Sequence, residues 1–577
     1  MVLSWHLKEK LKQILKKEQG AMVYAPGSRT GFALAYPNTY HVGMSNLGFQ
    51  IIYQQINSRQ DTACERTFLP DKKAEQEYLR THTPLMTIET QRPLYEFPLI
   101  GIAMTFEMDY FHLIKLLEMG RIPLLAADRK EQDPIVILGG PCATFNPEPI
   151  AAFVDVCIIG EGEEVIHELL DAYYEGQENH LTRQELLSSF SKLPGIYVPS
   201  LYHHHYSDDG ILSAITHDPI APDKVKRRWI ADLDAYPAHT VIVTEDTEFN
   251  NLYLLEVARG CGRHCRFCMA GYCFRRPRSR SLNKLKQYVD EAKRISCKAG
   301  LMGAAISDYP HIDELCRYIN EQKTGLSVAS LRADSLSLDL AEALGSSGQR
   351  TITLAPEAAS VKMRQVINKG ITDEHLFQSI DKAIQAGIVN VRLYVMVGLP
   401  FETENDVAEI GIMARKVKLH MEEMGSRGKL TLSINPFIPK PFTPFQWVPM
   451  CDMKTVEKRL SMIQASLKDQ QQIEVLIESP RESYIQGVLA RGDRRLSQVL
   501  LAAHRYGGAK GWKKAIKETG IDENFYLYRT RHMSEIVPWE TLSMGFEWSY
   551  LARELHNAEK LVATIPCFEG CRRCGIC

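Results

Sequence analysis

Two separate stretches of this chain alternate short apolar runs with amphipathic helical patterns, and this alternation restricts the fold more than any other feature. The first stretch covers residues 31–175 and contains the apolar runs GFALAYP, LIGIAMTF, PIVILGGP and VDVCIIG. Strands that alternate with helices form parallel sheets with helices on both faces. The pattern therefore predicts an α/β protein that begins with a Rossmann-like parallel sheet.

The second stretch begins near residue 250 and repeats the alternation. Its strands are expected at LYLLEV, LMGAAIS, LSVASLR, TITLAPE, VRLYVMVGLP and LTLSINPFIP, which gives six strand–helix units. Six units predict a partial (β/α)6 barrel, in which chemistry gathers on the loops that follow the strand carboxyl ends. After residue 450 the pattern becomes mainly helical with polar connections.

The chain of 577 residues is too long for one hydrophobic core, so several modules are expected. We predict a domain organisation of an N-terminal helix over 1–20, a Rossmann-like domain over 21–180, a connector over 181–244, a barrel over 245–450 and a helical C-terminal domain over 451–577.

Composition alone indicates no class of partner. The chain carries 68 basic and 70 acidic residues, so its net charge favours neither nucleic acid nor a membrane surface. No apolar run reaches the roughly 18 residues that span a bilayer. The first 20 residues lack the continuous apolar segment of a secretory signal. We expect a cytoplasmic protein without a membrane span.

Three cysteines, Cys261, Cys265 and Cys268, follow the first predicted barrel strand at C-x3-C-x2-C spacing. Clustered thiols at short spacing are typical of metal or cluster ligands rather than of a disulfide framework. Three thiolates leave one iron of a cuboidal cluster open, whereas a structural zinc ion needs a fourth ligand. His264 and Cys273 are the local candidates for that alternative.

The segment ARGCGRHCRFC, in this position, resembles the signature of the radical S-adenosylmethionine (SAM) superfamily. The resemblance implies an enzyme with a four-iron four-sulfur cluster on Cys261, Cys265 and Cys268. It also implies that SAM binds at the open iron and is cleaved by one electron to a deoxyadenosyl radical, which attacks an unreactive carbon. A reductant such as flavodoxin or ferredoxin is then the expected partner.

Other residues match the superfamily by their position at strand ends. The segment GAAIS at 303–307 resembles the one that receives the SAM amino group, although the usual glycine-rich acidic form is altered. Polar side chains end the third and fourth strands, and the turn VGLPFET after the fifth resembles the adenine-side turn. The cofactor-binding residues implied by the resemblance are Gly303, Ala304, Ala305, Ser307, Arg332, Glu357, Val397 and Leu399. Barrel-mouth packing and helix capping are the alternative roles.

The N-terminal region resembles the cobalamin-binding domain that precedes the barrel in one large radical SAM subgroup. Stretches such as PNTYHVGMSNLG, GGPCATFNPEP and APEAASVKMRQVINKG together look like an uncharacterised cobalamin-type branch. Ligands of parallel sheets lie beyond the strand carboxyl ends, where the GGP and GEGE loops fall. Gly139, Gly140, Gly160 and Gly162 are therefore candidate cofactor contacts.

The D-x-H-x-x-G motif, whose histidine lies beneath cobalt in the usual cobalamin module, is missing. In its nearest match Thr39 replaces the aspartate, and the glycine comes one residue early, at Gly43. His41 then lacks the orienting carboxylate of a metal-binding histidine. We interpret His41 as an ordinary loop histidine, which leaves cobalamin binding without a protein ligand, or a vestigial scaffold, as the two possibilities.

A second group of thiols, Cys567, Cys571, Cys574 and Cys577, closes the sequence. Four thiolates within eleven residues are enough for a second iron–sulfur cluster or for a closed zinc site, and the spacing does not decide between them. We expect a metal-ligand role for this group.

Basic residues at 275, 276, 278 and 280 follow the first thiol group, but they are not interleaved with aromatic residues as in a nucleic-acid platform. We predict a solvated charged loop.

The sequence as a whole predicts a cobalamin-type radical SAM enzyme that transfers a methyl group. One alternative is a cobalamin-free radical enzyme that performs sulfur insertion or rearrangement with an auxiliary C-terminal cluster. Another is a noncatalytic iron–sulfur or RNA-binding factor. The sequence identifies no catalytic acid or base and leaves the substrate open among RNA, protein and small molecules.

Overall fold

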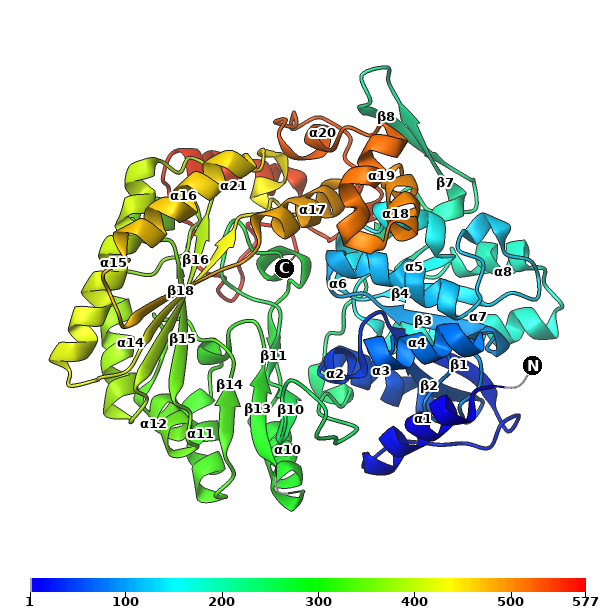
Figure 1. Ribbon diagram of the computed structural model, residues 1–577, viewed down its shortest axis with the longest axis horizontal. Helices are drawn as coiled ribbons and strands as arrows, with labels where there is room; N and C mark the ends of the chain where they lie inside the picture. The colour runs from blue at the N-terminus through cyan, green and yellow to red at the C-terminus, as the bar shows by residue number, and fades with distance from the viewer. Residues whose placement is uncertain (1–2, 296, 577) are drawn as a thin grey trace.

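The computed structural model describes residues 3–295 and 297–576. Two large parallel sheets, each flanked by helices, lie beside each other, and the C-terminal helices run across both (Figure 1). The predicted α/β class is confirmed.

The N-terminal sheet has the strand order β2-β1-β3-β4-β5-β6. All neighbouring strands are parallel except β5 and β6, which are antiparallel. The order reverses between β1 and β3, which makes the carboxyl ends of these two strands the expected ligand crevice of the sheet. The strands are β1 (Thr30–Tyr36), β2 (Thr62–Phe68), β3 (Leu99–Ala103), β4 (Ile135–Gly139), β5 (Val156–Ile158) and β6 (Ile196–Tyr197).

Helices cover this sheet because their apolar faces are buried against it. They are α1 (Trp5–Lys17), α2 (Tyr40–Met44), α3 (Leu47–Asn57), α4 (Lys72–Thr81), α5 (Tyr110–Met119), α6 (Pro141–Phe145), α7 (Gly162–Glu178) and α8 (Arg183–Phe190). The predicted connector contributes α8, β6 and an antiparallel hairpin of β7 (Tyr202–Tyr206) and β8 (Leu212–His217).

The second large sheet consists of a three-stranded and a four-stranded part, all parallel. A single parallel bridge between Leu331 and Leu354 joins the two parts. The order runs from β10 to β18, so within the described residues this is an open partial barrel. Its strands are β10 (Leu252–Glu256), β13 (Lys298–Met302), β14 (Leu326–Val328), β15 (Thr351–Glu357), β16 (Asn390–Val397), β17 (Leu430–Pro436) and β18 (Ile473–Ile477).

Amphipathic helices cover the outside of the partial barrel and bury a second, separate apolar core. They are α10 (Leu282–Arg294), α11 (Ile312–Glu321), α12 (Leu338–Ser346), α13 (Val361–Val366), α14 (Asp373–Gln385), α15 (Glu404–Glu423) and α16 (Met453–Ser466).

The partial barrel differs from the prediction in two places. It extends beyond residue 450, because β18 pairs with β17 as a further parallel strand. The sequence signal of β18 is weak, since the short run IEVLI follows the polar stretch KDQQQ. The second expected strand, LMGAAIS, ends already at Met302, and residues 303–305 form a loop that leads into a 3-10 helix at Ile306–Asp308.

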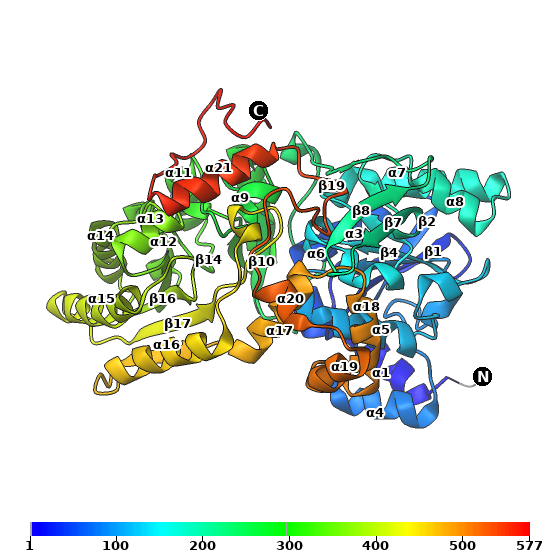
Figure 2. The same cartoon turned by 90° about the horizontal axis from the view of Figure 1, so that it is seen from above.

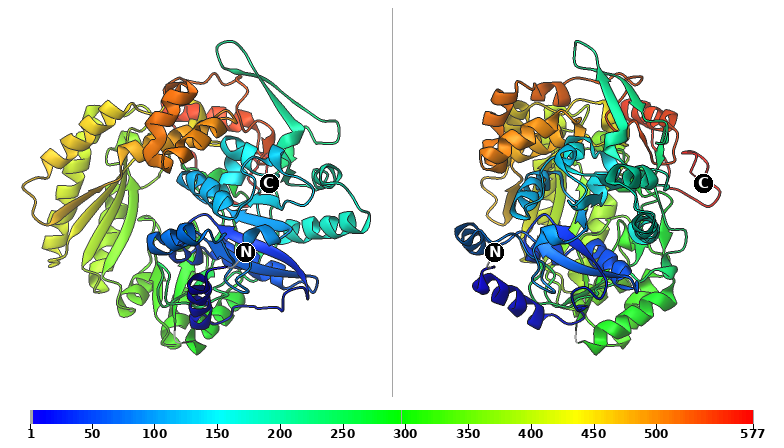
Figure 3. Two further views of the ribbon diagram at one scale, coloured as in Figure 1. Left: turned by 45° about the vertical axis from the view of Figure 1, so that its right-hand side comes forward. Right: turned by 90° about the vertical axis from the view of Figure 1, so that its right-hand side faces the viewer.

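The C-terminal helices connect the two large sheets (Figure 3). The Asn146 side-chain amide donates to the carbonyls of Ala490 (3.1 Å) and Gly492 (2.8 Å), and Arg494 forms an ion pair with Glu148 at 2.9 Å. These helices are α17 (Pro480–Arg491), α18 (Leu496–Arg505), α19 (Trp512–Thr519), α20 (Glu523–Leu527) and α21 (Trp548–Glu559). A two-residue parallel pair, β9 (Val225–Lys226) and β19 (Leu542–Ser543), adds a further connection.

Among the described residues we find no helix with the length and apolarity that crossing a membrane requires.

Candidate functional site

Cys261, Cys265 and Cys268 lie on one loop, residues 260–269, which we call the thiol loop. It follows β11 (Ala258–Arg259), which pairs with β12 (Arg278–Ser279), and it precedes α9 (Ala270–Cys273). Cys265 is buried and the other two thiols are half-buried. Burial, together with the neighbouring thiols Cys265 and Cys261, raises the pKa of Cys268 to about 12. Burial also raises the pKa of Cys261, so the thiols of Cys261 and Cys268 stay neutral unless a cation takes up their charge.

No group of three or more His, Cys, Asp or Glu side chains in the described chain is close enough to share one metal ion. A cuboidal iron–sulfur cluster asks for a different arrangement, because each thiolate binds its own iron atom. Three soft thiols on one short, partly buried loop are a donor set that fits such a cluster.

Charged side chains surround the thiol loop on its barrel side. Arg263 forms ion pairs with Asp308 at 2.8 Å and with Asp334 at 3.1 Å. Asp334 also pairs with Arg332 at 2.9 Å, and the Arg332 Nη1 atom lies 4.0 Å from the Cys265 sulfur. The sequence predicted Arg332 but not Arg263, Asp308 or Asp334. These three residues lie in separate segments of the chain, and only the fold brings their side chains together.

The other residues predicted at the strand ends occupy different surroundings. Glu357 ends β15 in a left-handed conformation (φ 64°) and pairs with Lys369 at 3.2 Å. A bulky residue rarely adopts this conformation outside functional or strained sites. Ser307 accepts a hydrogen bond from Ser335 (2.8 Å), while Val397 and Leu399 are buried among apolar side chains.

A cavity of about 540 Å³ lies between the N-terminal sheet and the thiol loop, and we call it the central cavity. It covers the carboxyl end of β3 and the adjoining part of β1, the two strands between which the strand order reverses. Its lining is mostly apolar, with side chains such as Phe32, Ile52 and Phe274. It joins six of the predicted residues, Gly139, Gly140, Gly160, Gly162, Gly303 and Ala304, to Gly260 of the thiol loop. Ala305, Ser307, Arg332, Glu357, Val397 and Leu399 are outside this lining.

Glycine is needed for backbone reasons at some positions of this cavity but not at others. Gly140 (φ 98°) and Gly160 (φ 106°) have left-handed backbones, and a Cβ atom at either position would lie within 2.7 Å of a backbone oxygen. Gly139 has no such restriction, because a Cβ built there meets no atom within 4 Å. The missing side chain of Gly139 therefore only keeps cavity space open.

A buried network of ion pairs fastens the thiol loop to the N-terminal sheet. Glu161 pairs with Arg278 at 2.6 Å and with Arg259 at 3.1 Å, and Arg259 also reaches Glu163 at 2.7 Å. Glu256 of β10 pairs with Arg259 at 2.8 Å. Arg259 directly precedes the thiol loop, so this network fixes the loop against the GEGE turn.

The predicted solvated charged loop at 275–280 is wrong. Arg275 and Arg280 are 1% and 2% exposed, and only Arg276 of the four arginines is exposed. Their partners come from distant segments: Arg280 pairs with Glu256 at 2.8 Å and donates to the Tyr236 carbonyl at the same distance. Burial of these guanidiniums depends on carboxylates and carbonyls that spacing along the chain does not reveal.

The C-terminal segment, residues 566–576, lies against the thiol loop, and we call it the thiol tail. Figure 2 shows it following α21 above the region of α9. The Cys567 N–H donates to the Gly262 carbonyl at 2.8 Å, and the Cys567 sulfur lies 3.5 Å from His264 Nε2. Cys571 and Cys574 are buried. Cys577, the fourth predicted ligand, is outside the described residues.

His264 of the thiol loop lies against the thiol tail. It is 1% exposed and contacts Arg275 at 2.8 Å and the Tyr550 hydroxyl through Nδ1. Burial and the guanidinium of Arg275 lower the pKa of His264 to about 3. The ring is therefore neutral at physiological pH.

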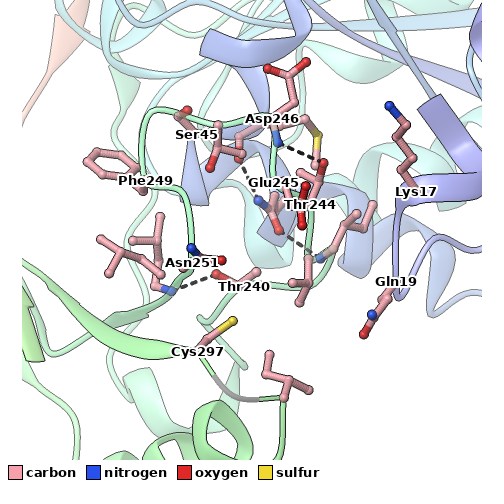
Figure 4. Close-up of a pocket in the computed structure, with 18 residues that line it drawn as sticks. Lys17, Gln19, Ser45, Thr240, Thr244, Glu245, Asp246, Phe249, Asn251 and Cys297 are labelled. Carbon is pink, nitrogen blue, oxygen red and sulfur yellow. Dashed lines mark hydrogen bonds between the residues drawn. The ribbon is translucent and has the colours of Figure 1, made fainter. Parts of the chain in front are cut away.

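His41 does not line the central cavity. It lies in the short helix α2, rather than in the loop we predicted, and its Nδ1 forms an exposed ion pair with Asp246 at 2.9 Å. A second cavity, of about 770 Å³, lies beside Asp246 between the helices α1–α3 and the segment 240–252. Its polar lining includes Ser45, Thr240 and Thr244 (Figure 4). This cavity contains none of the predicted site residues.

Two family models match the chain. The model described as "Radical SAM superfamily" matches residues 255–411, which include the thiol loop. The model described as "Radical SAM proteins, N-terminal" matches residues 48–199.

The chain belongs to the radical SAM superfamily.

Two relatives of this radical SAM enzyme match between half and four fifths of its length. An uncharacterised protein of Methanocaldococcus jannaschii is 31% identical over 476 residues, which are 81% of this chain and 90% of that protein. An uncharacterised methyltransferase of Pyrococcus horikoshii is 24% identical over 301 residues, 50% of this chain and 59% of the relative.

Among solved structures, the radical SAM methyltransferase TsrM of Kitasatospora setae, with cobalamin and a [4Fe-4S] cluster bound, has a similar fold. It matches with a TM-score of 0.50 and 12% identity, over 85% of this chain and 99% of that chain. The predicted superfamily, and a fold shared with one member that has cobalamin bound, are thus confirmed. Membership implies an enzyme that uses a 4Fe-4S cluster and SAM, with electrons from an external reductant.

Proposed function

We propose that this radical SAM enzyme transfers methyl groups to an unreactive carbon, with cobalamin in the central cavity and the 4Fe-4S cluster on Cys261, Cys265 and Cys268. One observation carries the proposal. A single cavity is lined both by the carboxyl-end loops of a parallel sheet with a strand-order reversal and by the thiol loop. When bound, SAM at the cluster supplies a carbon radical, and cobalamin supplies the methyl group.

The residues of the central cavity suit a large, flat and mainly apolar cofactor. Gly139, Gly140 and Gly303 allow close backbone approach, and the apolar side chains of Phe32 and Ile52 exclude water. His41 is not among the residues of this lining, which supports binding without a protein base.

The polar residues beside the thiols suit the amino acid end of SAM. The guanidiniums of Arg263 and Arg332 can attract a carboxylate, and the carboxylates of Asp308 and Asp334 can accept hydrogen bonds from an amino group. Gly303 and Ala304, exposed towards the central cavity, place backbone groups near the same loop. The buried Glu161–Arg259 pair holds the GEGE turn of the central cavity next to the thiol loop.

The test uses Gly139, where the backbone tolerates a side chain. Protein expressed with cobalamin and purified without oxygen should show corrin absorbance. The Gly139→Leu variant should lose at least about 90% of it, since the leucine side chain enters the cavity, while its iron content and unfolding midpoint stay those of the native chain. Gly139→Ala is the matched control and should retain most of the corrin.

Two results would overturn this proposal. One is a native protein that retains no corrin; the other is a Gly139→Leu variant that binds it as well as the native chain. Either would favour the cobalamin-free alternative, a radical enzyme for sulfur insertion or rearrangement.

A further inference from the structure

The thiol tail lies directly beside the thiol loop, although about 300 residues separate them in sequence. Two contacts at Cys567 join them: the backbone hydrogen bond to Gly262 and the approach of the sulfur to His264. Gly262 directly follows Cys261, and His264 directly precedes Cys265. The tail therefore meets the loop between two of its three thiols.

The tail is also held in place by its own contacts. The Arg573 guanidinium donates to the Pro566 carbonyl at 2.8 Å, and its Nε lies 3.2 Å from the Cys571 sulfur. The Arg573 carbonyl accepts from Arg553 of α21 at 2.9 Å, and the Cys574 carbonyl accepts from the Glu547 N–H at 3.2 Å. Three thiols, Cys567, Cys571 and Cys574, are thus presented on a fixed turn.

One buried cation, Arg275, contacts His264 beside Cys567 and has no carboxylate partner among the described residues. Arg275 is 1% exposed, and its Nη1 atom has no hydrogen-bond partner among the described residues. Its other nitrogens donate to the carbonyls of Gly271 and Arg263 and to His264, and its aromatic neighbours are Tyr272 and Tyr550. None of these groups is an anion. Burying a cation without an anionic partner destabilises the fold by several kcal/mol. A negative group beside this guanidinium would offset that cost.

We propose that Cys567, Cys571 and Cys574 hold a second iron–sulfur cluster, and that this cluster passes single electrons to the cluster on the thiol loop. A thiolate-bound cluster carries the negative charge that Arg275 lacks. The proposal rests on the proposed function only in placing the first cluster on the thiol loop; it is independent of cobalamin and of methyl transfer.

The electron balance is simple. A one-electron donor of the flavodoxin or ferredoxin class reduces the second cluster and is itself oxidised by one electron. The second cluster then returns to its oxidised state as the first becomes reduced, and no bond forms or breaks. The path from Cys567 to Cys261 consists of one hydrogen bond and the peptide of Gly262.

The metal content is the first test. In reconstituted native protein we expect about eight irons per chain, and about four in a variant with Cys567→Ser, Cys571→Ser and Cys574→Ser. The reduced native protein should give two electron paramagnetic resonance signals, and the variant only one. Zinc in the tail, or an unchanged iron content in the variant, would overturn the proposal.

The electron path is tested by kinetics. SAM cleavage is measured once with reduced flavodoxin and once with dithionite, a small reductant that reaches clusters directly. The ratio of the flavodoxin rate to the dithionite rate should fall at least tenfold in the triple variant. An unchanged ratio would refute the relay even if the second cluster exists.

A single charge change tests the site without removing a thiol. Arg275→Gln should keep about eight irons but lower the reduction potential of the second signal, because a nearby positive charge stabilises the reduced cluster. Arg572→Gln is the matched control, since Arg572 is exposed on the same tail. Equal potentials in Arg275→Gln and in the control would place the second cluster elsewhere. All three readouts can be obtained without cobalamin or a methyl acceptor, so a failed Gly139 experiment leaves them valid.

Discussion

The thiol loop has two sides that differ in character. On one side Gly260 borders the central cavity, whose wall is made of glycines and apolar side chains. On the other side Gly262 and His264 contact the thiol tail, where guanidiniums, phenols and thiols are buried together. An apolar wall favours a bulky ligand with little charge, whereas buried cations favour an anionic one. One loop of ten residues can therefore serve two different neighbours.

The two sides also hold the loop by different forces. The cavity side is fastened by paired charges, Glu161 with Arg278 and Arg259, that balance one another. On the tail side, Cys567 itself is held by a neutral backbone hydrogen bond to Gly262, and the nearby guanidinium of Arg275 lacks a balancing carboxylate among the described residues. The following changes test this contrast.

The largest effect is expected for Cys265→Ala. Loss of one of three thiolates should abolish the first cluster and lower SAM cleavage by at least about a thousandfold, because no open iron remains for SAM. The thiol tail should keep its own iron, about four per chain. Iron content and deoxyadenosine release measure the two sides separately. Complete loss of iron in this variant would mean that the two sides do not assemble independently.

The Glu161→Gln change should have a smaller effect, which is a loss of unfolding free energy. This change removes the charge that Arg278 and Arg259 share in a buried site, and breaking such a pair costs about 3–5 kcal/mol. Denaturant unfolding measures the loss. Glu164→Gln is the matched control, because the Glu164 side chain is partly exposed beside Arg228 and should contribute at most about 1 kcal/mol. Equal losses would contradict the balanced-charge description of the cavity side.

The smallest effect is expected for His41→Ala. Its partner Asp246 is exposed, so the unfolding free energy should change by at most about 0.5 kcal/mol. Corrin affinity should stay the same, because His41 does not line the central cavity. A loss of corrin affinity of tenfold or more, measured by titration, would show instead that the cavity side supplies a cobalt ligand after a rearrangement.

Features that depend on residues close together in the sequence could be predicted. Periodicity was sufficient for the two parallel sheets, and spacing was sufficient for the superfamily. The GGP and GEGE loops meet at one cavity, since the carboxyl ends of parallel strands share one edge of a sheet, and Gly303 reaches this cavity from the end of β13 in the other sheet. The assignment of individual ligands to individual residues stays a prediction.

Features that depend on distant partners could not be predicted. Burial of Arg275 and Arg280 depends on β10, on residues near 236 and on α21. The strand β18 forms because β17 offers a parallel edge, although its own apolar run is short. The contact of Cys567 with Gly262 joins the end of the chain to its middle, and no periodic pattern records it.

A ligand in the central cavity would also affect how stable the protein is in the cell. A ligand held between two modules binds only when both are folded and docked, so its binding free energy adds to the stability of the whole molecule. Interfaces between modules are otherwise weak points at which large chains open and meet proteases. Supply of the ligand would then set the abundance of the enzyme as well as its activity.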